Sequence, residues 1–101
     1  MSSIKQLQRA DARLVILRVL SQDRGYSANH RILRISIDQL AAITLNDDQV
    51  KEHLSWLEDR GAVTTDSVPP FTLAKLTDYG LSLAEGHATL DGVSRPRPDQ
   101  L

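Results

Sequence analysis

The amino-acid sequence predicts a mainly α-helical domain that carries one small β-hairpin. Residues 4–22 contain no glycine or proline and are rich in leucine, isoleucine and valine, as a long helix requires. Residues 47–63 combine apolar side chains at helical spacing, a glycine and an immediate change to β-type sequence. Two β-type runs then flank a turn with two adjacent prolines, which predicts the hairpin.

The bulk composition is that of a single globular domain. The chain has 101 residues, of which 41% are hydrophobic and 25% are charged, so it can bury one modest core. No apolar run approaches the roughly 18 to 20 residues of a membrane span, and Lys5 and Arg9 interrupt any signal-peptide pattern. The absence of cysteine excludes disulfides and favours a reducing, cytoplasmic environment.

The net charge of −1 hides an asymmetry along the chain. Residues 1–35 contain seven Lys or Arg and two acids, whereas residues 36–91 contain three basic residues and ten acids. Such asymmetry is typical of a nucleic-acid-binding face, but also of a self-complementary assembly or of scattered solvated charge.

The first predicted helix, residues 4–22, is apolar on more than one side. Leu7, Leu14 and Leu17 fall near one face, while β-branched residues widen the apolar surface beyond a single stripe. In so small a protein, part of this surface is expected to meet a second subunit in a homodimer. The dimer candidates are Ile4, Leu7, Val15, Ile16 and Val19.

Residues 28–43 fit two structures. In one, the apolar residues line the buried face of a single helix that is capped by Ser27 or Asn29 and includes Leu40. In the other, the alternation of apolar and polar residues at positions 33–37 forms a short strand before a shorter helix. We favour the single helix.

The central predicted helix begins near residue 47 and leads directly into the hairpin. Asn46 or Asp47 caps its start, and Gly61 stands where a left-handed C-terminal residue is needed. Its core stripe consists of Val50, Leu54 and Leu57. The hairpin strands are residues 62–66 and 71–76.

A short last helix completes the predicted domain. Thr77 is expected to cap this helix and Gly86 to close it. The prolines that follow favour extended backbone. The domain is therefore residues 1–86, and residues 87–101 form an extended or flexible tail.

This order of elements is that of a winged helix-turn-helix, and several phrases strengthen the comparison. VKEHLSWLEDRGAV, followed by AKLTDYGLSLAEG, resembles the recognition helix, wing and closing helix of many regulators. The chain more specifically resembles the small winged-helix, ArsR-like proteins of Mu-like phages and prophages. The resemblance rests on residues 11–14, Asn29, Leu33, Leu54-x-Trp56-Leu57, Leu76-Thr77-x-x-Gly80 and residues 92–96. It implies a phage-encoded protein in the cytoplasm of a bacterial host.

Two functions remain open at this stage. The first is a transcriptional regulator that binds duplex DNA, with the central helix in the major groove. Its candidate DNA contacts are Asn29, His30, Arg31, Arg34, Asn46, Gln49, Lys51, Ser55, Thr65 and Lys75. On a helical wheel, however, the outward face of the central helix carries three carboxylates and one serine, which suits a polyanion poorly.

The second is a winged helix that binds another phage or host protein and no DNA. Its partner-interface candidates are Asp48, Glu52, Trp56 and Asp59. We expect no enzyme, because the chain lacks a glycine-rich phosphate loop, a nucleophile elbow and a zinc-binding histidine pair. We likewise expect no cofactor or metal site, because the chain has no cysteine and its three histidines are far apart in sequence.

Overall fold

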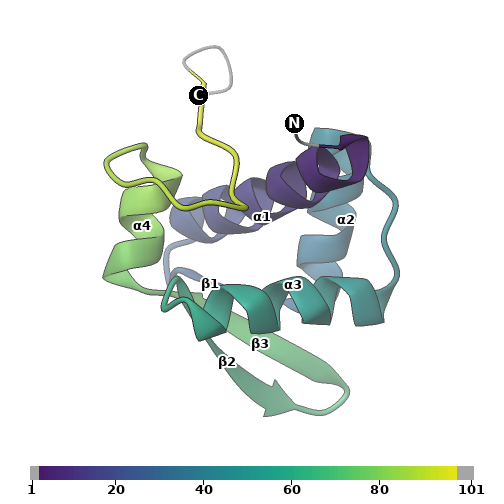
Figure 1. The fold of residues 1–101 in the computed structure, drawn as a ribbon. Helices are drawn as coiled ribbons and strands as arrows, with labels where there is room; N and C mark the ends of the chain where they lie inside the picture. Colours follow the sequence, from purple (N-terminus) through teal and green to yellow (C-terminus); the bar gives the residue numbers. More distant parts are fainter. Residues whose placement is uncertain (1–2, 98–101) are drawn as a thin grey trace.

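The structure is a computed structural model in which residues 3–97 are described. Its elements are α1 (Ile4–Gln22), β1 (Ser27–Asn29), α2 (His30–Ala41), α3 (Asp47–Asp59), β2 (Val63–Val68), β3 (Phe71–Leu76) and α4 (Asp78–Ala84). In Figure 1, α1 runs across the top, α3 crosses in front below it, and the β2–β3 hairpin projects downward. This is a winged helix-turn-helix, so the predicted fold class is confirmed. No helix among the described residues is long and apolar enough to cross a membrane.

The first helix has the predicted bounds. Ser3 and Gln6 form a capping box at its start, where each side chain bonds the backbone N–H of the other residue. The fully buried side chains fall at positions i, i+4, i+5 and i+8, which places one continuous stripe of α1 in the core. These side chains are Ala12, Ile16, Leu17 and Leu20.

The second helix is a single helix, as favoured, and the strand at residues 33–37 is wrong. The side-chain oxygen of Asn29 accepts a hydrogen bond from the N–H of Ile32 at 2.9 Å and so fixes the helix start. Leu33 and Ile37 are fully buried, whereas Ile35 is 41% exposed. Burial therefore follows the helical period and not the alternation of a strand.

The end of α2 differs from the prediction. The helix stops at Ala41, and the next residue, Ala42, adopts a left-handed conformation with φ of 55°. Leu40, expected in the core, is 69% exposed. It lies in the last turn of α2, beyond the part of the helix that the core covers.

The sheet has three antiparallel strands in the order β1-β3-β2, one strand more than the sequence predicted. The additional strand, β1, pairs with β3 so that Ser27 lies opposite Lys75 and Asn29 opposite Leu73. The hairpin itself is confirmed, with β2 extending to Val68.

The passage from α3 to the wing is built as the sequence predicts. Asn46 caps α3 and forms a capping box with Gln49. Gly61 has a φ of 79°, a left-handed conformation that glycine adopts without strain. The Thr77 hydroxyl, which also caps α4, donates to the carbonyl oxygens of Gly61 and Ala62 at 2.6 and 2.9 Å. The start of α4 is thereby fixed against the end of α3.

Residues 87–97 form no helix or strand and lie along α1 and α4 (Figure 1). Val93 is only 9% exposed, and the N–H of Ser94 donates to the carbonyl oxygen of Ala10 at 3.1 Å. Residues 98–101 of the predicted tail lie outside the described residues.

Candidate nucleic-acid interface

One face of α3 points to solvent along the whole length of the helix. Its residues, here called the outer stripe, are Asp48, Glu52, Ser55 and Asp59, and all four are exposed. They lie opposite the buried core stripe, as the helical wheel predicted. A solvated α-helix of this kind has the width that the major groove of B-DNA admits.

The negative charge of the outer stripe disfavours contact between this face of α3 and DNA. Three of its four side chains are carboxylates, and the exposed Lys51 stands at its edge. Asp47, in the first turn of α3, is neutralised by Arg34, whose Nε lies 2.9 Å from Asp47 Oδ1. Affinity for phosphates must therefore come from side chains that flank the stripe.

The arginines of α2 flank the stripe on one side. Arg31 is exposed, and its guanidinium lies 5.2 Å from the centroid of the Phe71 ring, near the tip of the wing. Arg34 is 38% exposed and is engaged by Asp47. Of these two candidates, Arg31 keeps its charge unpaired within the described residues.

His30 is a wrong DNA-contact candidate. The residue is 2% exposed, so it cannot reach a phosphate. Its Nδ1 accepts a hydrogen bond from the N–H of Thr72 at 3.1 Å, and its ring packs against Phe71 at a centroid distance of 6.0 Å. His30 therefore joins α2 to β3.

Three amide side chains among the candidates serve as caps. The oxygen of Asn29 accepts from Ile32, and Asn46 and Gln49 accept from each other's backbone N–H at 2.8 and 2.9 Å. Their oxygens are thus committed to the helix starts, which leaves their NH₂ groups as the atoms that can donate to DNA.

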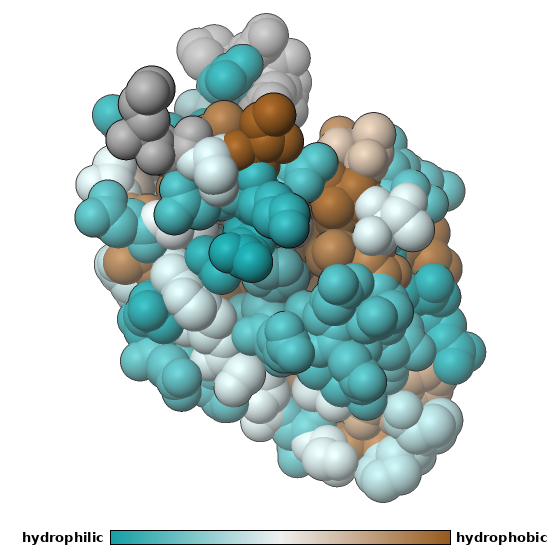
Figure 2. All heavy atoms as spheres, turned by 45° about the vertical axis from the view of Figure 1, so that its right-hand side comes forward, coloured by the Kyte–Doolittle hydropathy of each residue, from teal (hydrophilic) through white to brown (hydrophobic). Residues whose placement is uncertain are grey.

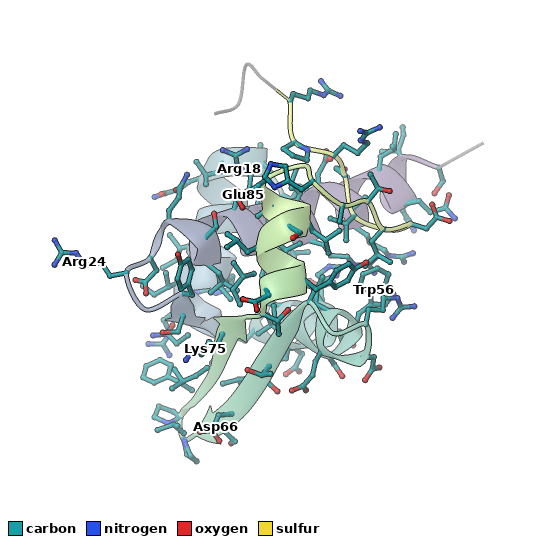
Figure 3. The ribbon with its side chains drawn as sticks, turned by 90° about the vertical axis from the view of Figure 1, so that its left-hand side faces the viewer. Arg18, Arg24, Trp56, Asp66, Lys75 and Glu85 are labelled. Atoms are coloured by element: carbon teal, nitrogen blue, oxygen red, sulfur yellow. The ribbon has the colours of Figure 1, made fainter. Side chains whose placement is uncertain are left out.

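The two candidate DNA contacts in the wing, Thr65 and Lys75, lie on opposite faces of the sheet. The N–H and the hydroxyl of Thr65 both donate to the carboxylate of Glu58 on α3, each at 2.8 Å. Because successive strand residues face opposite sides, Thr64 and its cross-strand partner Lys75 lie on the sheet face turned away from α3. In Figure 3, Lys75 and Trp56 accordingly lie on opposite sides of the molecule. Ser55 and Lys51 remain exposed on α3 itself.

Trp56 packs within the chain. The guanidinium carbons of Arg13 and Arg60 lie 3.8 and 3.7 Å from the centroid of its ring system, at the distance of strong cation–π contacts. A Cβ placed on Gly92 would lie only 2.7 Å from the indole, so the C-terminal segment also presses on the ring. These contacts leave only part of the Trp56 ring exposed to a partner protein. Trp56 is therefore a weaker candidate for an interface anchor than the sequence suggested.

A cationic cluster lies beside Trp56, where Arg60 joins Arg13 on the ring. Arg13 donates from Nε to His53 Nδ1 at 3.2 Å and from a terminal nitrogen to the carbonyl oxygen of Gly92 at 2.9 Å. Burial, together with Arg13 and Arg9, lowers the pKa of His53 to about 4, so His53 is neutral at pH 7. The spacing of Lys5, Arg9 and Arg13, four residues apart, was a sequence signal for this cluster.

Metal-binding side chains do not gather in the described part of the chain. Between residues 3 and 97, no three His, Cys, Asp or Glu residues lie close enough together to hold a metal ion.

Two solved structures resemble the fold. One is the complex structure of hsRosR-S4, which aligns with a TM-score of 0.57 and 17% identity over 84% of this chain and 85% of that chain. The other concerns the regulation of DNA binding of Bordetella bronchiseptica BpsR by 6-hydroxynicotinic acid. It aligns with a TM-score of 0.51 and 20% identity over 81% of this chain and 59% of that chain. At these identities the likeness shows the fold.

Two relatives found by sequence have higher identity to the chain than these solved structures, although no family model matches the chain. The uncharacterized protein gp26 of Escherichia phage Mu is 37% identical over 95 residues, which are 94% of this chain and 97% of gp26. An uncharacterized protein of Haemophilus influenzae is 35% identical over 100 residues, or 98% of this chain and 96% of that protein. Both alignments span nearly the whole of each protein, and the chain therefore belongs to the family of small proteins that includes gp26 of phage Mu.

Proposed function

We propose that this protein is a phage-type transcriptional regulator that binds duplex DNA with α3 in the major groove. The observation that supports it most is the solvent-exposed outer stripe of α3, bordered by the capped start of α2 and by the wing. This is the arrangement with which helix-turn-helix proteins enter DNA. The fold likeness to BpsR, whose DNA binding is regulated, gives independent support. The absence of cysteine agrees with action in the cytoplasm of a bacterial host.

Fluorescence anisotropy with a labelled mixed-sequence duplex tests this function. At about 50 mM salt we expect binding at tens of micromolar protein or below, because non-specific DNA binders have dissociation constants of about 10⁻⁴ to 10⁻⁶ M even at physiological salt. Arg31→Gln should weaken binding, whereas Arg24→Gln, at an exposed position on the opposite side of the molecule from Trp56 (Figure 3), should leave it unchanged. An unchanged anisotropy up to about 100 μM wild-type protein contradicts the proposal.

The acidity of the outer stripe favours a second candidate function, a module that binds a basic surface of another phage or host protein. Asp48, Glu52 and Asp59 form no ion pair among residues 3–97 and project from one helix face. Opposite charges on a partner would be attracted to this stripe, whereas DNA would be repelled. The effect of neutralising the three acids on DNA affinity distinguishes the two functions.

We also infer a homodimer that forms through the exposed apolar side of α1. Ile4 and Leu7 are 75% and 52% exposed, and Leu40 of α2 is 69% exposed beside a hollow of about 460 Å³ that Val15 helps to line. In Figure 2, apolar atoms reach the surface between hydrophilic ones on the side that carries α2 and the start of α1. Of the other dimer candidates, Val19 is half-buried, but Ile16 is fully buried in the core and is wrong.

Sedimentation equilibrium tests the dimer. The wild type should sediment with twice the chain mass of 11.2 kDa, and Leu7→Lys should sediment as a monomer because the charge cannot be buried in an apolar contact. Leu73→Lys, at an exposed position on the sheet, is the matched control and should remain dimeric. A wild-type protein that stays monomeric at about 100 μM, where even weak dimers form, excludes this assembly.

A further inference from the structure

A line of cations runs beside α3 on the side that faces α1. Its residues, here called the basic ridge, are Lys5, Arg9 and Arg13 of α1 and Arg60 after the end of α3. The three residues of α1 are four positions apart and so share one helix face. Lys5, Arg9 and Arg60 are exposed, and Arg13 is partly buried.

Contacts with α3 fix the position of the ridge. Arg9 lines a hollow of about 210 Å³ together with Gln49 and Glu52. Arg13 and Arg60 lie on the ring system of Trp56. The ridge thus follows α3 from about residue 49 to residue 60, a length of roughly 16 Å at 1.5 Å per residue. Trp56 follows Ser55 of the outer stripe by about 100° around the helix, so the ridge borders that stripe.

The cations of the ridge are not engaged in ion pairs within the described residues. None of the ion pairs formed there includes Lys5, Arg9, Arg13 or Arg60. The hydrogen-bond acceptors of Arg13 and Arg60 are a neutral histidine and two carbonyl oxygens. Burial lowers the pKa of Arg13, and Arg60 and Arg9 lower it further because they carry the same charge.

Two acids, Glu52 and Asp91, lie near the ridge and partly offset its positive charge. Glu52 lines the hollow described above, and Asp91 lines a second one, of about 520 Å³, which Arg9 and Arg13 also line. One hollow thus places Lys5 and Arg9 near Glu52, and the other places Arg9 and Arg13 near Asp91. Arg9 lines both hollows and is exposed, so it is the ridge residue best placed to meet an incoming anion.

We propose that the basic ridge binds the phosphodiester backbone of the DNA strand that borders α3 on its α1 side, with Arg9 as the main contact. A helix in the major groove has a phosphate backbone on each side, and phosphate contacts fix its position. Arg31 and Lys51 stand on one side of α3, and the ridge stands on the other. This inference rests on the proposed DNA binding and supplies the cations that the acidic outer stripe lacks.

The salt dependence of DNA binding tests the ridge. The slope of log K against log salt changes by about 0.9 for each phosphate contact, so Arg9→Gln should reduce its magnitude by about 1 and weaken binding severalfold at low salt. Arg24→Gln makes the same change of charge at an exposed position on the opposite side of the molecule from Trp56 (Figure 3) and should keep the wild-type slope. Equal thermal stability of the two variants would show that Arg9→Gln leaves the fold intact.

The possible outcomes distinguish a failure of the ridge proposal from a failure of the proposed DNA binding. Wild-type binding with an unchanged slope for Arg9→Gln overturns the ridge and leaves DNA binding standing. No binding by the wild type overturns both. Titration with inorganic phosphate at matched ionic strength identifies the source of the phosphate. Saturable displacement of DNA by free phosphate would overturn the assignment to the backbone, and an effect equal to that of chloride supports it.

Discussion

Replacing Gly80 with alanine is expected to destabilise the domain by about 3 kcal/mol, the upper end of the usual range for overpacking. A Cβ at this position would lie 2.0 Å from the carbonyl oxygen of Ala62 and 2.7 Å from Leu76 Cδ1. The Ala62 carbonyl cannot move away freely, because it accepts hydrogen bonds from the N–H and the hydroxyl of Thr77. The better helix propensity of alanine, about 1 kcal/mol, is too small to offset the clash. Urea unfolding followed by Trp56 fluorescence measures the loss.

Gly25→Ala is the matched control. Its Cβ would make ordinary contacts, the nearest at 3.4 Å to Asp23 Oδ2. A glycine-to-alanine change without strain alters stability by about 1 kcal/mol or less. If Gly80→Ala unfolds at the same urea concentration as Gly25→Ala, α4 does not press on the end of α3 as the structure indicates.

Local signals were sufficient to predict the helices and the wing. The bounds of α1, the cap at Asn46 and the turn at Gly61 each depend on residues only a few positions apart. The outer stripe of α3 follows from the same periodicity, since its position depends only on where the core stripe lies. The strand β1 could not be found in this way. It has three residues, and its partner β3 is more than 40 positions away.

The site was harder to predict because it depends on which elements pack together. His30 precedes the buried Leu33 and Ile37 by three and seven residues, so the helical period already placed it on the buried face. The spacing of Lys5, Arg9 and Arg13 was equally visible. What the sequence could not show is that α1 lies beside α3, which brings Arg13 and Arg60 to the same tryptophan.

Neutralising the outer stripe is expected to raise DNA affinity about tenfold to hundredfold at low salt, if α3 enters the groove. The variant is Asp48→Asn, Glu52→Gln and Asp59→Asn. Each carboxylate near DNA phosphates costs roughly 0.5 to 1 kcal/mol at an effective dielectric between those of water and protein surface, and the three effects add. The fold should be retained, because Asn46 still caps α3 and the loss of Asp48 from its first turn costs about 0.3 to 1 kcal/mol.

The control must change the net charge equally without touching the outer stripe. Asp38→Asn, Asp78→Asn and Glu85→Gln meet this condition, because all three residues are exposed and lie outside α3. An increase in DNA affinity that both variants share reflects the change in net charge. Any additional increase in affinity for the stripe variant shows that the DNA lies next to the outer stripe. An excess of tenfold or more places α3 in the groove. No excess would mean that the stripe faces away from DNA, and its uncompensated acids would then favour a basic protein surface as the partner.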